Sequence, residues 1–209
     1  MKSFILQWSN VIKFEESVKY ISSKMKGVYL HFLRFDDYYR IVYVGSGLIK
    51  DEQVKYFRQY KRGEGFVIDL EKIEDDPYSY ITNGKYNESL NARILYAGGT
   101  NADLKGKYLD ELKNVAKHYS RGLYLSFSEL DEDCEKAEAI IQKYLINRYK
   151  IDYYNGGNLV GLRNTFGLKQ KMPYKVINNF YPAYHCWFQN LPSTIEDTNL
   201  PYIRRQTVS

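Results

Sequence analysis

Two short tripeptides that pair tyrosine with glycine are the residues in this chain most suited to chemistry. Gly27-Val28-Tyr29 and Tyr43-Val44-Gly45 lie in apolar segments typical of β-strands, over residues 27–35 and 39–45. The Asp36-Asp37 pair between them is a turn signal, so the sequence predicts a β-hairpin.

The register of this hairpin decides whether the two tyrosines can act together. A three-residue turn places Tyr43 opposite His31 and makes Tyr29 a diagonal neighbour of Tyr43 on the same face. A two-residue turn places them on opposite faces, because side chains alternate along a strand. Two phenol groups on one face can polarise a water molecule and hold a phosphate oxygen. The alternative is two half-buried strand tyrosines among the 22 in the chain.

Glu138 is the second candidate, because it falls on the apolar side of a helix predicted over residues 131–148. Cys134, Glu138, Ile141 and Leu145 share one face at helical spacing, whereas Gln142 and Lys143 are expected on the solvated side. Burying a carboxylate costs several kcal/mol, of order 5, unless it is paired or coordinates a metal. Glu138 is therefore a candidate Mg²⁺ ligand, with a buried salt bridge as the alternative.

A third group of residues forms a basic stripe on a helix predicted over residues 51–62. Lys55, Arg58 and Arg62 recur at i, i+3 and i+7. A cation at this place could neutralise a phosphate as charge builds up in a transition state. A solvated basic face explains the same spacing.

The composition narrows the classes of protein that fit the chain. It has 209 residues and a net charge of +5 with a pI near 8.9, which suits a polyanionic partner. No apolar run is long enough for a membrane span, and Cys134 and Cys186 form no Cys-x-x-Cys pair, so we expect a cytoplasmic protein without a membrane anchor. Nucleotide-binding glycine loops and the Gly-x-Ser-x-Gly motif of serine hydrolases do not occur in the sequence.

The remaining segments predict an α/β chain of the α+β type. Besides the hairpin, we expect a strand at 123–127 and helices at 11–21, at 104–119 and at 131–148, with two short strands at 66–70 and 93–97. Three strands of this kind can form a small antiparallel sheet with helices around it.

Together, the two tripeptides, the Glu138 helix and Tyr154-Asn155 resemble the GIY-YIG endonuclease family in residue type and order. The resemblance implies a divalent-metal-dependent nuclease that cuts DNA, expected to be double-stranded, with Mg²⁺ or Mn²⁺ as cofactor. It implies that Tyr29 is the general base, that Tyr43 supports it, and that Glu138 holds the metal. Asn155 takes a structural or phosphate-side role, with Asn158 as the alternative.

The chain departs from the family pattern at the phosphate-binding arginine. The family places it about eight residues after the second tripeptide, where this sequence has Gln53, so we assign the role to Arg58. Lys55, Arg62 and His31 are weaker candidates for DNA contacts. If the arginine is missing, the chain is a catalytically inactive nucleic-acid-binding protein on the same scaffold. An unrelated basic interaction domain is a third hypothesis.

The domain organisation that follows is one domain over residues 1–209. Residues 27–158 form the nuclease-like core, with an insertion at 63–103. Residues 159–209 form a C-terminal extension expected to contact DNA. The sequence leaves open whether the protein is a monomer or a homodimer.

Overall fold

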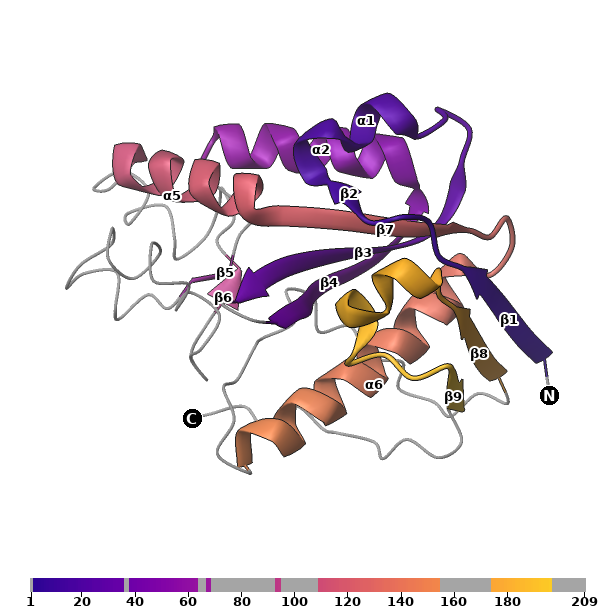
Figure 1. The fold of residues 1–209 in the computed structure, drawn as a ribbon. Helices are drawn as coiled ribbons and strands as arrows, with labels where there is room; N and C mark the ends of the chain where they lie inside the picture. The colour runs from indigo at the N-terminus through magenta and orange to yellow at the C-terminus, as the bar shows by residue number, and fades with distance from the viewer. Residues whose placement is uncertain are drawn as a thin grey trace.

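The computed structural model of the protein describes residues 2–35, 38–63, 67–68, 93–94, 109–154 and 174–196. It has mixed α+β architecture with two main sheets, of four and three strands (Figure 1). The strands are β1 (Lys2–Gln7), β2 (Ile12–Lys13), β3 (Lys26–Phe35), β4 (Tyr38–Leu48), β5 (Val67–Ile68), β6 (Arg93–Ile94), β7 (Leu123–Glu129), β8 (Tyr174–Asn179) and β9 (Thr194–Glu196). The helices are η1 (Phe14–Glu16), α1 (Ser17–Tyr20), α2 (Ile49–Lys61), α5 (Leu109–Gly122), α6 (Cys134–Tyr154) and η4 (Pro182–Phe188).

The central sheet has the strand order β2-β7-β3-β4, and every pair in it is antiparallel. It contains the predicted hairpin as β3 and β4 and the predicted third strand as β7. Helices α2 and α5 lie on one face and α6 on the other (Figure 1). Among the described strands, β4 is at the edge of this sheet, which leaves one side of its backbone without a strand partner.

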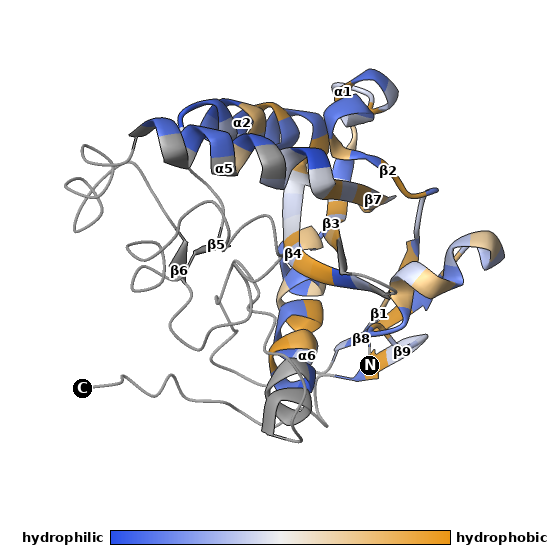
Figure 2. Ribbon diagram, turned by 60° about the vertical axis from the view of Figure 1, so that its left-hand side comes forward, coloured by the Kyte–Doolittle hydropathy of each residue, from blue (hydrophilic) through white to orange (hydrophobic). Residues whose placement is uncertain are grey.

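Alternation along β3 divides the hydrophobic core between the two faces. Tyr29 and Leu33 pack with the side chains of α2 and α5, whereas Val28, Leu30 and Phe32 pack with those of α6. Figure 2 shows hydrophobic residues on β3, β4 and α6 where these elements meet. The sheet is therefore buried on both faces, as a layered α+β fold requires.

The hairpin pairs His31 with Tyr43, as predicted for a three-residue turn, but its turn is shorter and one strand contains a bulge. Phe35 pairs with Tyr38, so two residues connect the strands, and not three. The register shifts between His31 and Phe32, where Val42 is the additional residue of a β-bulge. The bulge restores the pairing of His31 with Tyr43, so Tyr29 and Tyr43 lie on one face as the longer turn predicted.

The prediction of a single three-stranded sheet is wrong in the number of sheets and strands. A second sheet has the order β1-β8-β9, in which β1 pairs with β8 in parallel and β8 with β9 in antiparallel. Its first pair joins Lys2 to Tyr174, residues far apart in the sequence. Local periodicity carries no signal for such a pairing, and β2 adds a fourth, two-residue strand to the central sheet. Residues 174–196 thus pack against the N-terminal strand as part of the fold.

The predicted helix at 11–21 is also wrong for most of its length. The chain there forms β2, η1 and the four-residue helix α1. Val11 packs with the core on one side of the sheet and Ile12 with the core on the other. Consecutive residues that face opposite sides follow the period of a strand, and not that of a helix.

The other predicted elements are present with shifted ends. Helix α2 begins two residues before the predicted 51 and ends at Lys61, and α6 extends beyond 148. Helix α5 is described from Leu109, and residues 104–108 of the predicted helix lie outside the described residues. The two short strands predicted in the 63–103 insertion are β5 and β6, which pair with each other. The rest of that insertion and Asn155 lie outside the described residues. None of the described helices is long and apolar enough to cross a membrane.

Candidate active site

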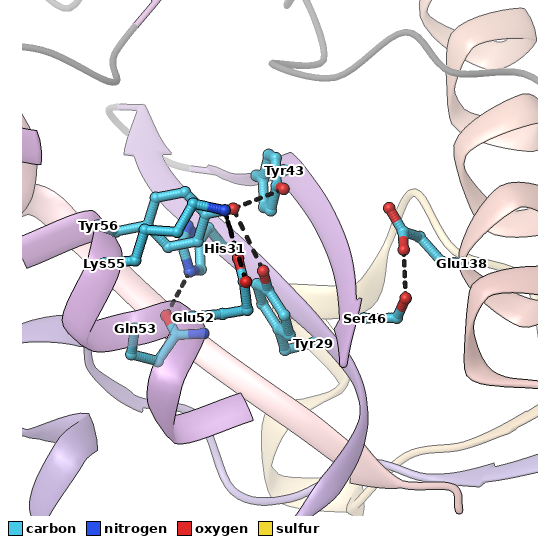
Figure 3. A network of polar contacts seen from close by, with 9 residues as sticks. All are labelled: Tyr29, His31, Tyr43, Ser46, Glu52, Gln53, Lys55, Tyr56 and Glu138. Carbon is cyan, nitrogen blue, oxygen red and sulfur yellow. Dashed lines mark hydrogen bonds and ion pairs between the residues drawn. The ribbon is translucent and has the colours of Figure 1, made fainter. Parts of the chain in front are cut away.

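Three tyrosine hydroxyl groups meet between the central sheet and helix α2. The Tyr56 hydroxyl donates a hydrogen bond of 2.6 Å to the Tyr43 hydroxyl and lies 3.2 Å from the Tyr29 hydroxyl (Figure 3). The rings of Tyr29 and Tyr43 are 5.9 Å apart between centroids. The two predicted tyrosines are therefore brought together, but a third tyrosine from α2 connects their hydroxyl groups.

Tyr29 occupies the most buried place in this cluster. Its side chain is 1 % exposed. Burial raises its pKa well above the usual value, and the neighbouring Tyr43 and Tyr56 raise it further. A phenol in this environment stays protonated at neutral pH, so the structure does not favour Tyr29 as the group that removes a proton from water.

Tyr56 is the functional candidate that the sequence analysis missed. Gln53, Tyr56 and Tyr60 are all buried on the face of α2 that packs on the sheet. Their spacing of i, i+3 and i+7 is a helical face, and this pattern could have identified Tyr56.

The residue at the expected arginine position points into the protein interior. The amide oxygen of Gln53 accepts a hydrogen bond of 2.8 Å from Nε2 of His31, and both side chains are fully buried. The Gln53 Nε2 atom has no hydrogen-bond partner among the described residues. His31 thus lies beneath the tyrosines, and because it is buried it is not positioned to contact DNA.

The basic residues of α2 lie on its exposed side. Arg58 is two residues from Tyr56, which is about 200° around a helix, so it points away from the cluster. Lys55 is exposed and forms an ion pair of 3.1 Å with Glu52. Arg62 is exposed at the C-terminal end of the helix. The structure does not bring Arg58 to the tyrosines, and its role as the phosphate ligand stays a prediction.

Gly45 allows Tyr29 to reach across the neighbouring strand. A Cβ atom at this position would lie 2.7 Å from Cε1 of Tyr43 and closer still to Cζ and the hydroxyl oxygen of Tyr29. Because these distances are shorter than real Cβ contacts, the phenol group of Tyr29 occupies the space that a side chain would need. Glycine in the second tripeptide therefore serves the packing of the tyrosine in the first.

Glu138 lies on the packed side of α6, as predicted. Its carboxylate accepts hydrogen bonds from the Ser46 hydroxyl and, at 2.6 Å, from Nε2 of Gln142. Burial raises its pKa, and the hydrogen bond from Ser46 partly offsets that effect. Gln142 and Lys143 are buried, so their predicted place on the solvated side is wrong. Gln142 is one turn after Glu138 and shares its face.

The tyrosine cluster and Glu138 flank the same strand from opposite sides. Gly45 lies under the Tyr29 phenol, and the next residue of β4, Ser46, bonds Glu138 on the other face. Figure 3 shows Tyr29, Tyr43 and Tyr56 on one side of β4 and Glu138 on the other. Among the described strands, β4 is the edge strand of the central sheet, so the two groups share the edge strand as their common element.

The Glu138 side of this site has the chemistry of a divalent-cation ligand. The described part of the chain contains no group of three His, Cys, Asp or Glu residues that could hold a metal. Mg²⁺ does not require one, because it often takes one or two carboxylates together with water and substrate phosphate. Gln142 turns its Nε2 atom toward the carboxylate, and its Oε1 atom is buried without a hydrogen-bond partner among the described residues. The Glu138 carboxylate is therefore the hard oxygen ligand that fits such a cation.

Asn155, the remaining predicted site residue, lies just beyond the described part of α6, so its role stays a prediction. Comparison of the chain with known proteins found no matching family model, no matching characterised protein and no matching solved structure.

Proposed function

We propose that the protein is a divalent-metal-dependent endonuclease that hydrolyses phosphodiester bonds in double-stranded DNA. The observation that supports this proposal most strongly is the arrangement at β4. The hydrogen-bonded phenol groups of Tyr29, Tyr43 and Tyr56 lie on one side of β4, beside Gly45. The Glu138 carboxylate lies on the other side, where it accepts a hydrogen bond from Ser46. The basic net charge of +5 suits a DNA partner, and two free cysteines accord with the proposed cytoplasmic location.

In the proposed reaction, Glu138 on one side of β4 would bind the metal, and the phenol groups on the other side would contact the attacking water. Mg²⁺ or Mn²⁺, when bound, would polarise a phosphate oxygen and neutralise developing charge. Glu138 is the side chain that would hold it. Because Ser46 donates a hydrogen bond to one carboxylate oxygen, it would hold the Glu138 side chain in place beside β4. The phenol cluster supplies hydrogen bonds to the water that attacks phosphorus.

The function is tested by incubating supercoiled plasmid with the purified protein in Mg²⁺, in Mn²⁺ or in EDTA. The proposal predicts nicked and linear products with either metal and intact plasmid in EDTA. Glu138→Gln should abolish cleavage and keep DNA binding. Glu135→Gln is the matched control, since Glu135 is exposed on the same helix.

A second candidate function is DNA binding without cleavage on the same scaffold. The burial of Tyr29 and the replacement of the expected arginine by a buried Gln53 favour it. This alternative predicts salt-sensitive DNA binding with no products in either metal at any protein concentration. If neither cleavage nor salt-sensitive binding is found, both functions are rejected.

A further inference from the structure

The hydrogen bonds among the three tyrosines have a definite direction. Tyr56 donates to Tyr43 at 2.6 Å, and Tyr56 and Tyr29 are 3.2 Å apart between hydroxyl oxygens. A phenol has a single hydrogen to donate. Because Tyr56 gives its hydrogen to Tyr43, Tyr29 must be the donor to Tyr56. The donor chain therefore runs from Tyr29 through Tyr56 to Tyr43.

This direction coincides with a gradient of burial. Tyr29 is 1 % exposed and Tyr56 is 4 % exposed, whereas Tyr43 is half-buried on the edge strand. The chain of donors thus begins in the interior and runs toward Tyr43, the phenol residue with the most exposed side chain of the three. The Tyr43 oxygen receives a hydrogen bond from Tyr56 that would strengthen if that oxygen became negative.

We infer that Tyr43, and not Tyr29, contacts the attacking water in the proposed hydrolysis, and that Tyr56 is a positioning residue that orients the Tyr43 oxygen and donates a hydrogen bond to it. The role in hydrolysis rests on the proposed function, whereas the order of the three phenols does not. The raised pKa of Tyr29, caused first by burial, accords with a group that stays protonated.

Tyr43 acts as the general base in this hydrolysis. Tyr43 first releases its proton to solvent, and the Tyr56 O–H stabilises the resulting phenolate. The phenolate then takes a proton from water as the water oxygen forms a bond to phosphorus. The bond from phosphorus to the leaving sugar oxygen breaks, and that oxygen takes a proton from solvent. One water is consumed for each phosphodiester cleaved.

Other polar and charged groups lie near the phenol cluster and can influence how Tyr43 titrates. From β3 there is His31, whose ring is 5.3 Å from that of Tyr43. From α2 there are Glu52 and Lys55, which form an ion pair with each other, so their charges partly offset. Glu138 is on the other side of β4. Removing the hydroxyl of Tyr56 leaves all of these groups in place.

The order of the phenols is tested by placing 3-fluorotyrosine at position 43 or 29 of the full chain and following its ¹⁹F signal with pH. We expect the signal at 43 to titrate at lower pH than the signal at 29, a comparison that needs no further substitution. Tyr56→Phe should raise the midpoint at 43 by about one to two pH units, because a hydrogen bond to the charged form is lost.

Tyr60→Phe is the matched control, since Tyr60 is buried on the same face of α2, one turn after Tyr56. It should leave the midpoint at 43 unchanged. Two results would overturn the donor order from Tyr29 through Tyr56 to Tyr43. One is a titration midpoint at position 43 that is the same in Tyr56→Phe as in the unsubstituted protein. The other is a midpoint at position 29 that is lower than the midpoint at position 43.

The catalytic part of the inference is tested by single-turnover cleavage. Tyr43→Phe should slow cleavage by about 10²–10⁴-fold and Tyr29→Phe by less. In Tyr56→Phe, the rise of rate with pH should move to higher pH. If the unsubstituted protein does not cleave DNA, the proposed function fails and the phenol order is still decided by the ¹⁹F titration. If Tyr29→Phe is the slower variant, Tyr43 is not the group that meets water.

Discussion

The phenol ring of Tyr29 lies across the backbone of Gly45, so the first tripeptide depends on the last residue of the second. We predict that Gly45→Ala displaces the Tyr29 ring, lowers stability by about 1–3 kcal/mol as overpacking does, and abolishes cleavage. Urea unfolding and the plasmid assay measure the two effects.

Gly122→Ala is the control for this change. Its added carbon would lie 3.6 Å from Cδ2 of Leu33, which is an ordinary van der Waals contact. It should leave both stability and cleavage nearly unchanged. If Gly45→Ala is as harmless as Gly122→Ala, the close approach of Tyr29 to the strand is not a feature of the folded protein.

We expect the charged Glu138 carboxylate to lower the free energy of unfolding at neutral pH. Its pKa is raised in the folded state because burial disfavours the charged carboxylate. Such a group stabilises the fold at pH below its unfolded pKa, and that contribution is lost as pH rises through the folded pKa. Glu138→Gln should therefore melt at a higher temperature than the unsubstituted protein near pH 7, with the difference shrinking under acidic conditions. A lower melting temperature at pH 7 in metal-free buffer would contradict this prediction.

Ser46 should control how well Glu138 holds a metal. Its hydroxyl donates to the carboxylate and lowers the Glu138 pKa, so Ser46→Ala should raise that pKa further. The acidic limb of the pH–rate profile should then move to higher pH, and the Mg²⁺ concentration needed for half-maximal cleavage should rise about 10-fold.

The control for Ser46 is Ser128→Ala. The Ser128 hydroxyl is buried on β7 and has no hydrogen-bond partner within the described ranges. Its removal should leave the Mg²⁺ requirement unchanged. Equal Mg²⁺ requirements for Ser46→Ala and Ser128→Ala would show that the bond from Ser46 does not prepare a metal ligand.

The exposed cations of α2 should affect DNA binding more than the chemical step. Lys55→Ala, Arg58→Ala and Arg62→Ala should each weaken binding and reduce the slope of log affinity against log salt by about one. A transition-state contact would instead lower the single-turnover rate at saturating protein, by about 10²-fold or more. Because Arg58 points away from the tyrosines, we expect the first outcome. A rate loss confined to Arg58→Ala would place the scissile phosphate on the outer side of α2.

The sequence predicted the parts of the site that local patterns determine. For a three-residue turn, strand alternation placed Tyr29 and Tyr43 on one face, and helical spacing placed Glu138 on the packed side of α6. The β-bulge at Val42 could not be predicted, because the predicted and observed turns give the same pairing of His31 with Tyr43. Local periodicity does not distinguish a longer turn from a shorter turn with a bulge.

Interactions between distant segments could not be predicted either, because local periodicity carries no information about them. The parallel pairing of Lys2 with Tyr174 leaves no local signal, so the second sheet was not predicted. Helical spacing identifies Tyr56 as part of a buried helix face. Its hydrogen bonds to Tyr29 and Tyr43 depend on how α2 packs on the sheet, which the sequence does not show. At the expected arginine position, Gln53 turns inward and accepts a hydrogen bond from His31, a contact between two distant segments that the sequence does not reveal.

In the proposed hydrolysis, the phenol cluster and Glu138 serve one site from the two sides of β4. The most direct test is single-turnover cleavage of duplex DNA in Mg²⁺ by Tyr43→Phe, Glu138→Gln and the variant that combines them. Groups of one catalytic unit are not additive, so the combined variant should be about as slow as the slower single variant. If the rate losses multiply, or if either single variant cleaves at the normal rate, the two sides of β4 do not form one site.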